Sequence, residues 1–564
     1  MIRSGDTAII PSKRKQSVAL QKTFEQGVKR HRAGRYAEAE ELYRRVLEAR
    51  PDNPDVLHML GVAIHQARQD PAAPELIQRA IALRPNFPQA YSSLGNLLRQ
   101  RGDRRGAIAA CRQAIALHPF FAEAYNNLGS ALKDDGRVAD AAKSYARAVE
   151  LDGAYTPALY NLAVTLHELG EYEQAVGVHE RAIAADPRAP AGYVNLGVTL
   201  YALGQFARAE ELYRRALALN PGDGRALHNR ALCLQELDRL DEALEAFRAA
   251  IDVDPGFSDG HWNYALALLS GGRFDDGWAE YEWRWKVKGF PSRLRHTDTP
   301  RWDGSALDGR TLLLYEEQGL GDTIHFVRYV SMVSRGAGAV MVEAAPALAR
   351  LLRSLPGVHA VVATGDALPP FDVQLPMLSL PKLFATTLET VPAEVPYLHP
   401  DAGAVRRWQD RIPRGGDKAI GLVWAGSATH RRDATRSIAL SSLAPLFSRS
   451  TAHWFSLQVG ERAKDLEALA PGLLTDLSGS LADFTETAAA IVTLDLVITV
   501  DTAVAHLAGA LGRPVWVLLP FVSDWRWLRE REDSPWYPTM RLFRQPRAGD
   551  WAGVVERVGA ALSS

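Results

Sequence analysis

An aspartate after a glycine-rich turn is the first residue whose setting suits a general base. Asp322 directly follows the turn Gly319-Leu-Gly321, which itself comes after the apolar run 311–315. A carboxylate in such a loop can remove the proton of a hydroxyl group. An aspartate that opens a helix is equally explained as an N-cap, so the residues alone leave both roles open. The turn is not a G-x-G-x-x-G pattern, which argues against dinucleotide redox chemistry.

Cations gather after a second apolar run, 419–425. A small-residue turn that contains Ser427 is followed by His430 and three arginines, of which Arg436 is the last. Guanidinium groups and backbone N–H groups together suit a phosphate. We therefore predict phosphate binding at Ser427 and Arg436, and a solvated charged loop is the alternative.

A third apolar run, 494–500, ends in Asp501 and Thr502 at the start of a helix-like segment. The dipole and the N–H groups at such a helix start attract an anion. Because an aspartate there would repel phosphate, we predict that Asp501 contacts sugar hydroxyls while Thr502 and the N–H groups contact a diphosphate. His506 lies one helical turn further on, on the same face as Thr502. The alternative is that these residues only cap the helix.

These segments belong to a region in which apolar runs alternate with helix-like stretches. The alternation predicts parallel sheets covered by helices, and such sheets bind ligands at the carboxyl ends of their strands. Two series of runs predict two doubly wound, Rossmann-like lobes, 309–400 and 417–564, with a linker at 401–416. The second lobe is expected to end in a helix, 550–564.

The first half of the chain repeats itself every 34 residues. Each unit has the pattern of two amphipathic helices, with glycine at the turn and proline after the second helix. We predict eight units over 20–290, after a flexible N-terminus at 1–19 and before a linker at 291–308. The pattern resembles the tetratricopeptide repeat, which implies an α-solenoid whose concave face binds protein. The turn glycines are Gly34, Gly102, Gly136, Gly170, Gly204 and Gly272, with Arg68 and Asp238 at the two remaining steps.

Five asparagines also recur every 34 residues, each on the first helix of its unit. Positions in the same phase form a ladder along the solenoid, and side-chain amides suit the backbone of an extended peptide. The ladder resembles the one in the peptide-binding superhelix of O-linked N-acetylglucosamine transferases. The alternative is that asparagine is only a frequent choice at this repeat position. The ladder residues are Asn127, Asn161, Asn195, Asn229 and Asn263.

Composition excludes several classes of protein. The 564 residues are 47% hydrophobic and 23% charged with a net charge of −1, which argues against disorder and against nucleic acid or anionic membrane as the main partner. The two cysteines, Cys111 and Cys233, are too few and too far apart for a disulfide framework or a zinc site. Without an N-terminal apolar region or a long uncharged apolar run, the expected location is the cytoplasm, without membrane insertion.

Residues 310–560 resemble the lipopolysaccharide heptosyltransferases, a family of GT-B glycosyltransferases. The segment 501–514, Asp-Thr-Ala-Val-Ala-His-Leu-Ala-Gly-Ala-Leu-Gly-Arg-Pro, looks like the donor-site signature of that family, and Gly319-Leu-Gly-Asp322-Thr looks like its N-lobe loop. The resemblance implies a nucleotide-sugar donor bound as substrate in the C-lobe, and inverting transfer without metal or cofactor. It also implies that Asp322 is the general base and that Arg436 is a phosphate ligand.

The whole arrangement is similar to bacterial proteins that join tetratricopeptide repeats to such a domain, some of them linked to flagellin glycosylation. This likeness implies a protein or peptide acceptor on the concave face of the repeats, with flagellin as one example. Two features depart from the family pattern: Ala503 stands where glycine is common, and the segment 520–528 is aromatic. They bear on the identity of the donor more than on the fold.

Three hypotheses follow. The first is a glycosyltransferase that selects a protein hydroxyl acceptor through its repeats. The second is a non-catalytic scaffold in which the GT-B domain is degenerate. The third, an enzyme of small sugar nucleotides such as an epimerase, leaves the repeats without a role. The Trp- and Arg-rich segment 524–540 either packs the lobes together or forms a wall for nucleotide or acceptor.

Overall fold

The computed structural model describes residues 13–334, 338–412, 417–430, 432–448 and 451–563. Residues 1–12 and 413–416, which belong to the predicted N-terminal segment and inter-lobe linker, lie outside the described residues. The chain divides into two compact units, Met1–Ala226 and Leu227–Ser564. Each is described by itself below.

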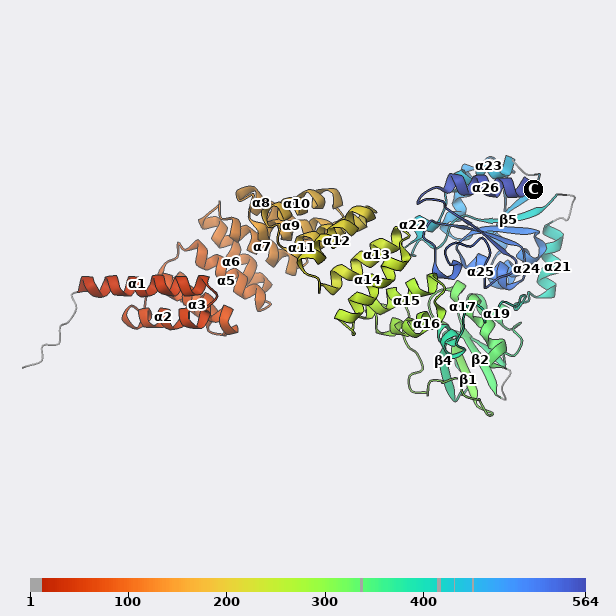
Figure 1. The fold of residues 1–564 in the computed structure, drawn as a ribbon, viewed down its shortest axis with the longest axis horizontal. Helices are drawn as coiled ribbons and strands as arrows, with labels where there is room; N and C mark the ends of the chain where they lie inside the picture. The colour runs from red at the N-terminus through yellow and green to blue at the C-terminus, as the bar shows by residue number, and fades with distance from the viewer. Residues whose placement is uncertain (1–12, 335–337, 413–416, 431, 449–450, 564) are drawn as a thin grey trace, which may run out of the picture. The chain divides into compact units, whose positions relative to one another are not determined.

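The first unit is a series of helix pairs, as the 34-residue period predicts (Figure 1). The first helix begins at Lys13, so residues 13–19 of the predicted flexible segment are helical. The helices are α1 (Lys13–Arg32), α2 (Tyr36–Ala49), α3 (Pro54–Arg68), α4 (Ala73–Leu83), α5 (Pro88–Gln100), α6 (Arg104–Leu117), α7 (Ala122–Asp134), α8 (Val138–Leu151), α9 (Thr156–Glu168), α10 (Tyr172–Ala185), α11 (Pro190–Ala202) and α12 (Phe206–Leu219).

Small residues in the repeat pattern have two physical roles. The turn glycines adopt positive φ, as at Gly136 (80°), and Asp238 takes the same backbone region at its step (62°). In-phase glycines inside the helices permit close packing. A Cβ on Gly129 would lie 2.6 Å from the ring of Tyr145, so any larger residue there would separate the paired helices.

The second unit begins with the last repeats. These comprise α13 (Gly224–Glu236), α14 (Leu240–Val253), α15 (Ser258–Ser270), α16 (Phe274–Tyr281) and the short helix η1 (Glu282–Lys286). The sixteen helices α1–α16 make eight pairs, which confirms the predicted α-solenoid.

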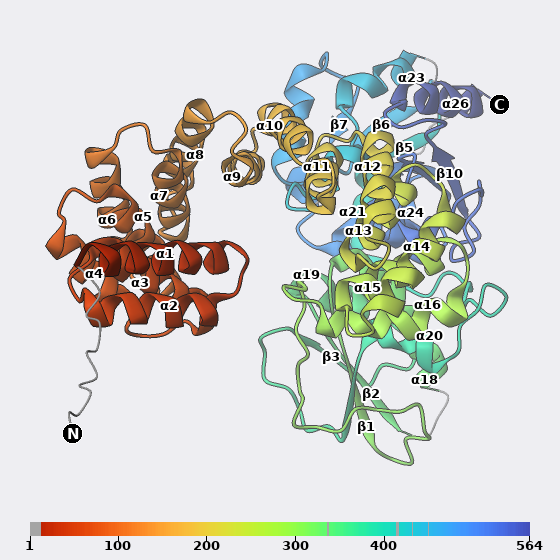
Figure 2. The same ribbon diagram turned by 60° about the vertical axis from the view of Figure 1, so that its left-hand side comes forward.

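Two parallel sheets follow the repeats (Figure 2). The N-lobe sheet has the order β3-β2-β1-β4 and the C-lobe sheet the order β10-β9-β8-β5-β6-β7, with every strand pair parallel. The N-lobe strands are β1 (Thr311–Tyr315), β2 (Ala339–Ala344), β3 (Ala360–Ala363) and β4 (Val373–Pro376). The C-lobe strands are β5 (Ala419–Val423), β6 (His453–Ser456), β7 (Thr475–Asp476), β8 (Leu496–Val500), β9 (Val515–Leu519) and β10 (Met540–Arg544).

Helices between the strands complete the two α/β lobes and confirm the predicted fold class. They are α17 (Leu320–Phe326), α18 (Val330–Val333), α19 (Pro346–Leu352), α20 (Leu380–Leu383), α21 (Ala402–Arg411), α22 (Asp433–Arg436), α23 (Ala444–Ser448), α24 (Phe484–Thr493), α25 (Ala503–Ala510) and α26 (Trp551–Ser563). Between α17 and α18 the chain forms a 3-10 turn at Val327–Tyr329. The inter-lobe segment contains α21, and α26 is the expected final helix.

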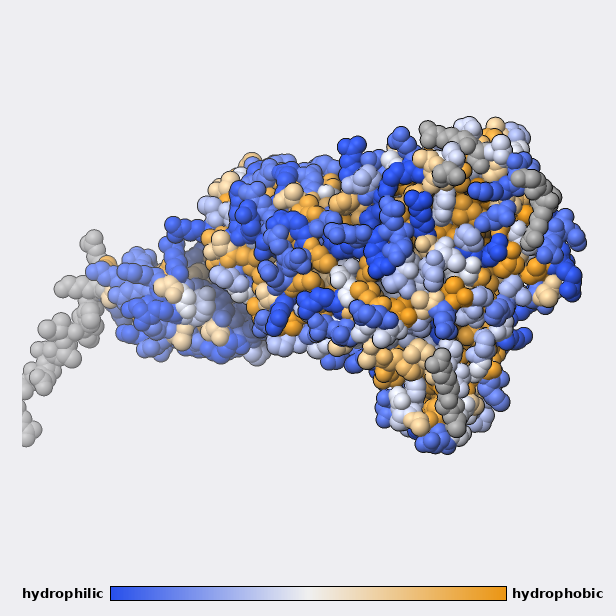
Figure 3. Space-filling model, turned by 45° about the vertical axis from the view of Figure 1, so that its right-hand side comes forward, coloured by the Kyte–Doolittle hydropathy of each residue, from blue (hydrophilic) through white to orange (hydrophobic). Residues whose placement is uncertain are grey.

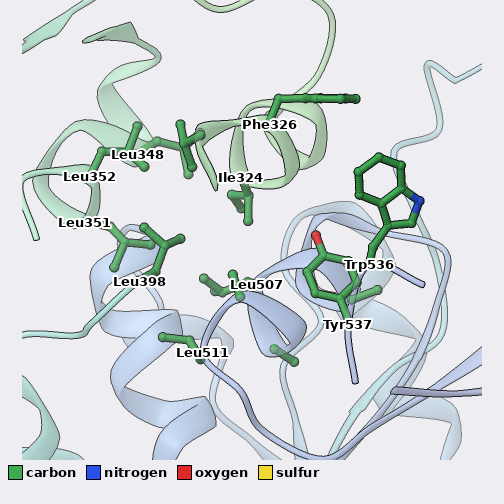
Figure 4. Close-up of a cluster of buried hydrophobic side chains, with 14 of the residues drawn as sticks. Ile324, Phe326, Leu348, Leu351, Leu352, Leu398, Leu507, Leu511, Trp536 and Tyr537 are labelled. Atoms are coloured by element: carbon green, nitrogen blue, oxygen red, sulfur yellow. The ribbon is translucent and has the colours of Figure 1, made fainter. Parts of the chain in front are cut away.

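One hydrophobic core of the second unit includes side chains from the last repeat and from both lobes. It extends from Phe274 and Trp278 of the last repeat, through the N-lobe, to the C-lobe. Figure 4 shows the part in which Ile324 of α17 and Leu507 of α25 come from the two lobes. Because both lobes and the last repeat bury side chains in one core, their packing positions the strand ends that face one another.

Hydrophilic residues cover much of the face of the molecule seen in Figure 3, with hydrophobic residues between them. Among the described helices, none combines the length and the apolar character needed to cross a membrane.

Candidate functional site

Asp322 lies in the first turn of α17 and makes two contacts that fix its orientation. Its Oδ2 accepts a hydrogen bond from the backbone N–H of Gly319 at 2.8 Å. Gly319 is the N-cap of α17, so Asp322 supports the helix start from the N3 position and is not the N-cap that the sequence allowed. Its Oδ1 forms an ion pair with Arg526, which belongs to the C-lobe. The side chain retains 20% exposure, so a ligand can still reach it.

Arg526 is the residue that joins the two lobes at this point. It lies in the short helix η7 (Trp525–Trp527), donates to Asp524 at 2.8 Å, and has its guanidinium carbon 4.3 Å from the ring centre of Trp525. Its side chain is only 7% exposed. Burial opposes its charge, but Asp524 and Asp322 outweigh that effect and raise its pKa. Arg526 is therefore a permanent cation between a C-lobe and an N-lobe carboxylate.

Asp501 lies half-buried directly after β8. Burial, and then the neighbouring carboxylate of Asp524, raise its pKa to about 6. Trp527 and the guanidinium groups of Arg436 and Arg526 act in the opposite direction. Asp501 is thus electrostatically coupled to residues that follow other strands, and strand ends from both lobes meet here as the parallel topology predicts.

Arg436 lies against the turn that follows β5. A Cβ on Gly426 would come within 2.4 Å of its Nη2, so this turn needs glycine for the guanidinium group to lie there. The Nε of Arg436 lies 3.7 Å from a carboxylate oxygen of Asp433, and this buried Nε has no hydrogen-bond partner among the described residues. The hydroxyl of Ser427 contacts that of Thr429 at 2.8 Å and is exposed. Arg431 lies outside the described residues.

Thr502 is the N-cap residue of α25. Its hydroxyl lies 3.0 Å from that of Thr499 and does not cap the helix. The first turn of α25 therefore receives no side-chain cap from Thr502, as expected of a helix start that would bind an external anion.

His506 lies in the contact between α17 and α25. Its Nδ1 is 3.0 Å from the hydroxyl of Tyr537 and 3.3 Å from Nδ1 of His325, and its ring stacks on Trp527 at 5.1 Å. Burial lowers the pKa of both histidines well below 6.5. Gly321 permits this packing, because a Cβ there would meet the His506 ring at 3.1 Å. The geometry thus gives Gly321 and His506 a packing role between the lobes.

The asparagine ladder lies on the first helices of the repeats, and all five side chains are half-buried. In the first unit, Asn127 donates to Ser92 at 3.0 Å and Asn161 donates to Asn126 at 2.9 Å, so these two amides connect neighbouring repeats. Asn161 and Asn195 line a groove of about 300 Å³ together with Tyr160, Val164 and Thr165. In the second unit, Asn263 donates to a carbonyl of its own helix at 3.0 Å. The positions of Asn195 and Asn229 follow the same repeat phase.

Comparison with known families agrees with this geometry. Residues 31–97, and overlapping stretches between 93 and 282, match the tetratricopeptide repeat. Residues 454–519 match glycosyltransferase family 9 (heptosyltransferase). The chain carries tetratricopeptide repeats and a family 9 segment. The family 9 match includes Asp501, Thr502 and His506.

The chain is also similar to Protein FlbA of Caulobacter vibrioides, at 26% identity over 315 residues. The match spans about half of each protein, 52% of this chain and 52% of FlbA. Among solved structures, the repeats resemble YrrB, described as a tetratricopeptide-repeat protein with an unusual peptide-binding site (21% identity, TM-score 0.31, 33% of this chain and 96% of YrrB). They also resemble MamA (28%, 0.28, 29% and 95%) and PilF of Pseudomonas aeruginosa (19%, 0.35, 38% and 96%).

Several residues of the site were not identified from the sequence. Arg526 lies within the Trp- and Arg-rich segment, whose unusual composition was the available signal. His325 follows Asp322 by three residues, and only the packing of α17 on α25 reveals its partner. Among the residues that the structure describes, no group of three His, Cys, Asp or Glu side chains is placed to hold a metal ion.

Proposed function

We propose that this chain transfers a sugar from a nucleotide-sugar donor to a hydroxyl group of a protein acceptor selected by the repeats. The observation that carries the proposal is the ion pair between Asp322 of the N-lobe and Arg526 of the C-lobe, in a cluster that includes Asp501 and Arg436. A base candidate and a phosphate-binding candidate on facing lobes are what glycosyl transfer requires.

The C-lobe supplies the donor end of the site. Arg436, Thr502 and the N-terminus of α25 bind the diphosphate, because guanidinium and N–H groups stabilise its negative charge. Asp501 accepts hydrogen bonds from sugar hydroxyls, and its carboxylate keeps phosphate away from that part of the pocket. Ser427, in the turn after β5, and Gly319, in the facing loop of the N-lobe, complete the proposed donor site.

The transfer is inverting, with Asp322 as the general base. The acceptor hydroxyl gives its proton to a carboxylate oxygen of Asp322 while its oxygen bonds to the anomeric carbon. The bond between that carbon and the diphosphate oxygen breaks, and its electron pair stays on the diphosphate. Arg436 and Thr502 stabilise the charge that develops there, and Arg526 holds Asp322 in its orientation.

A thermal-shift panel with UDP, ADP, GDP, TDP and CMP tests the donor site, on the wild type and on Asp501→Ala/Thr502→Ala. A nucleotide at 100 times its Kd stabilises the fold by about 2.7 kcal/mol. We expect one nucleotide to raise the Tm of the wild type and not that of the variant. If none does so, the proposed donor site is wrong.

The base is tested with Asp322→Ala. We expect this variant to lose transfer at least about a hundredfold while its affinity for the nucleotide identified above stays within twofold, because Asp322 acts on the acceptor. Unchanged turnover would remove Asp322 from the mechanism.

A scaffold without catalysis is the second candidate. It is favoured by one observation, that both carboxylate oxygens of Asp322 already accept hydrogen bonds, from Gly319 and Arg526. A scaffold would bind its partner protein through the repeats without any nucleotide, so the thermal-shift panel also separates these two functions.

A further inference from the structure

The last repeat and the linker after it make hydrogen bonds to the loop that precedes the helix of Asp322. This loop, Glu316 to Gly319, connects β1 to α17. Gln318 within it is not glycine yet has φ of +61°, a backbone region that costs free energy unless neighbouring contacts impose it. Two hydrogen bonds impose it here: the Gln318 N–H donates to Ser292 Oγ at 2.7 Å, and the side-chain amide donates to Tyr281 Oη at 2.9 Å. Tyr281 is the last residue of α16, and Ser292 follows it in the linker.

The preceding residue of the loop, Glu317, is held by the same repeat. Glu317 is buried and forms a two-pronged ion pair with Arg284, with N–O distances of 2.7 and 2.9 Å. Arg284 is wholly buried in η1, and its remaining donors bind Glu282 and Ser379 at 2.8 Å each. A buried ion pair tolerates little displacement, because moving one partner leaves the other charge unpaired.

Arg526, the partner of Asp322, is also connected to this repeat, through Trp525. Trp525, which stacks with the guanidinium of Arg526, has its ring centre 5.3 Å from that of Trp278 and 6.4 Å from that of Tyr281. The last repeat therefore contacts both the N-lobe loop that precedes the helix of Asp322 and Trp525, the C-lobe residue against which Arg526 packs. The contacts between α15 and η7 lie in the same part of the unit.

We propose that the last tetratricopeptide repeat is part of the catalytic centre, with Tyr281 and Arg284 as positioning residues that hold the Glu317–Gln318 loop and thereby Asp322. This inference rests on the proposed function. It goes further because it gives the last repeat a second role besides acceptor selection, which is to hold Asp322 in position.

The test uses the full chain with mild substitutions, since replacing Arg284 would leave Glu317 buried without a partner. Tyr281→Phe deletes one hydroxyl and keeps the ring. Gln318→Gly keeps the left-handed backbone accessible and removes the amide. The matched control is Tyr329→Phe, which deletes another buried hydroxyl of the same unit, one bonded to Thr386 at 2.8 Å.

Hydrogen–deuterium exchange of the segment 316–324 is measured for each variant. The release of nucleotide from the sugar donor is followed in the same variants and gives kcat and the KM for the donor. We expect Tyr281→Phe and Gln318→Gly to speed exchange in this segment and to lower kcat about tenfold, with donor KM within twofold. Tyr329→Phe should lower the Tm by a similar amount, with exchange in the segment 316–324 and kcat both equal to those of the wild type.

Loop exchange equal to that of the wild type in both variants would overturn the proposal. So would faster exchange with kcat unchanged, since the loop would then not position the base. A wild type that releases nucleotide from no donor would count against the proposed function instead, and the exchange result would still decide whether the repeat holds the loop.

Discussion

At the scale of single residues, the proposed phosphate contact of Arg436 depends on a glycine at position 426. Arg436 lies so close to Gly426 that a Cβ there would overlap its guanidinium. The overlapping atoms are the far end of a flexible side chain, so an alanine would displace Arg436 at little cost to the fold.

We therefore expect Gly426→Ala to weaken nucleotide diphosphate binding about tenfold, as Arg436→Met would, with Tm nearly unchanged. Titration calorimetry with the nucleotide selected by the thermal-shift panel measures this. Gly479→Ala is the control, because a Cβ at Gly479 meets nothing within 4 Å. Wild-type affinity in Gly426→Ala would show that Arg436 does not bind the phosphate.

Asp501 gives the stability of the fold a pH dependence of definite sign. Its pKa is raised from 3.8 to about 6, so between these values the folded chain holds a proton that the unfolded chain has lost. The contribution of Asp501 to the free energy of unfolding is therefore greatest below pH 4 and falls as pH rises to 6, by up to about 3 kcal/mol. Asp501→Asn should remove this dependence and be the more stable protein at pH 7. Denaturant unfolding at several pH values checks this, and parallel curves for the two proteins would contradict it.

At the scale of elements, α17 and α25 bury a pair of histidines with Arg328 and Arg526 as the neighbouring charges. Both rings have pKa values well below 6.5, whereas in the unfolded chain they bind protons from about pH 6.5 downward. The packing of the two helices is therefore stable above pH 6.5 and weakens as the pH falls.

Both histidines therefore lower the free energy of unfolding as the pH falls below 6.5, because only the unfolded chain binds protons at these two rings. We expect the Tm of His325→Asn to fall less steeply than that of the wild type as the pH drops below 6.5. This effect has the opposite sign to that of Asp501, so each is measured as the difference between variant and wild type. If the Tm of His325→Asn falls as steeply below pH 6.5 as that of the wild type, the prediction is wrong.

At the scale of the whole molecule, the repeats are proposed to select the acceptor. Replacing the five ladder asparagines with alanine should raise acceptor KM several-fold and leave donor affinity unchanged, because the proposed role of these amides is to bind the backbone of the acceptor peptide. Ser92→Ala is the control, since it breaks the bond from Asn127 while leaving that amide in place. If acceptor KM stays at its wild-type value without the ladder, the asparagines serve only to connect repeats.

Local pattern was enough to predict much of this molecule. The 34-residue period predicted eight helix pairs, because the signal for each pair lies within its own unit. The apolar runs predicted seven of the ten described strands, among them β1, β5 and β8, and the ends of these three strands pointed to Asp322, Arg436 and Asp501. The strands β4, β7 and β10 were not predicted, since short runs such as 475–476 carry too little periodicity.

What the amino-acid sequence determined by itself was the repeat architecture, the two lobes and the side chains that each strand end presents. Only the tertiary structure decided which of these side chains meet. Arg526 reaches Asp322 across 204 residues, Arg284 reaches Glu317 across 33, and His506 reaches His325 across 181. No periodicity encodes such contacts, because they depend on how the shared core brings the last repeat and both lobes together.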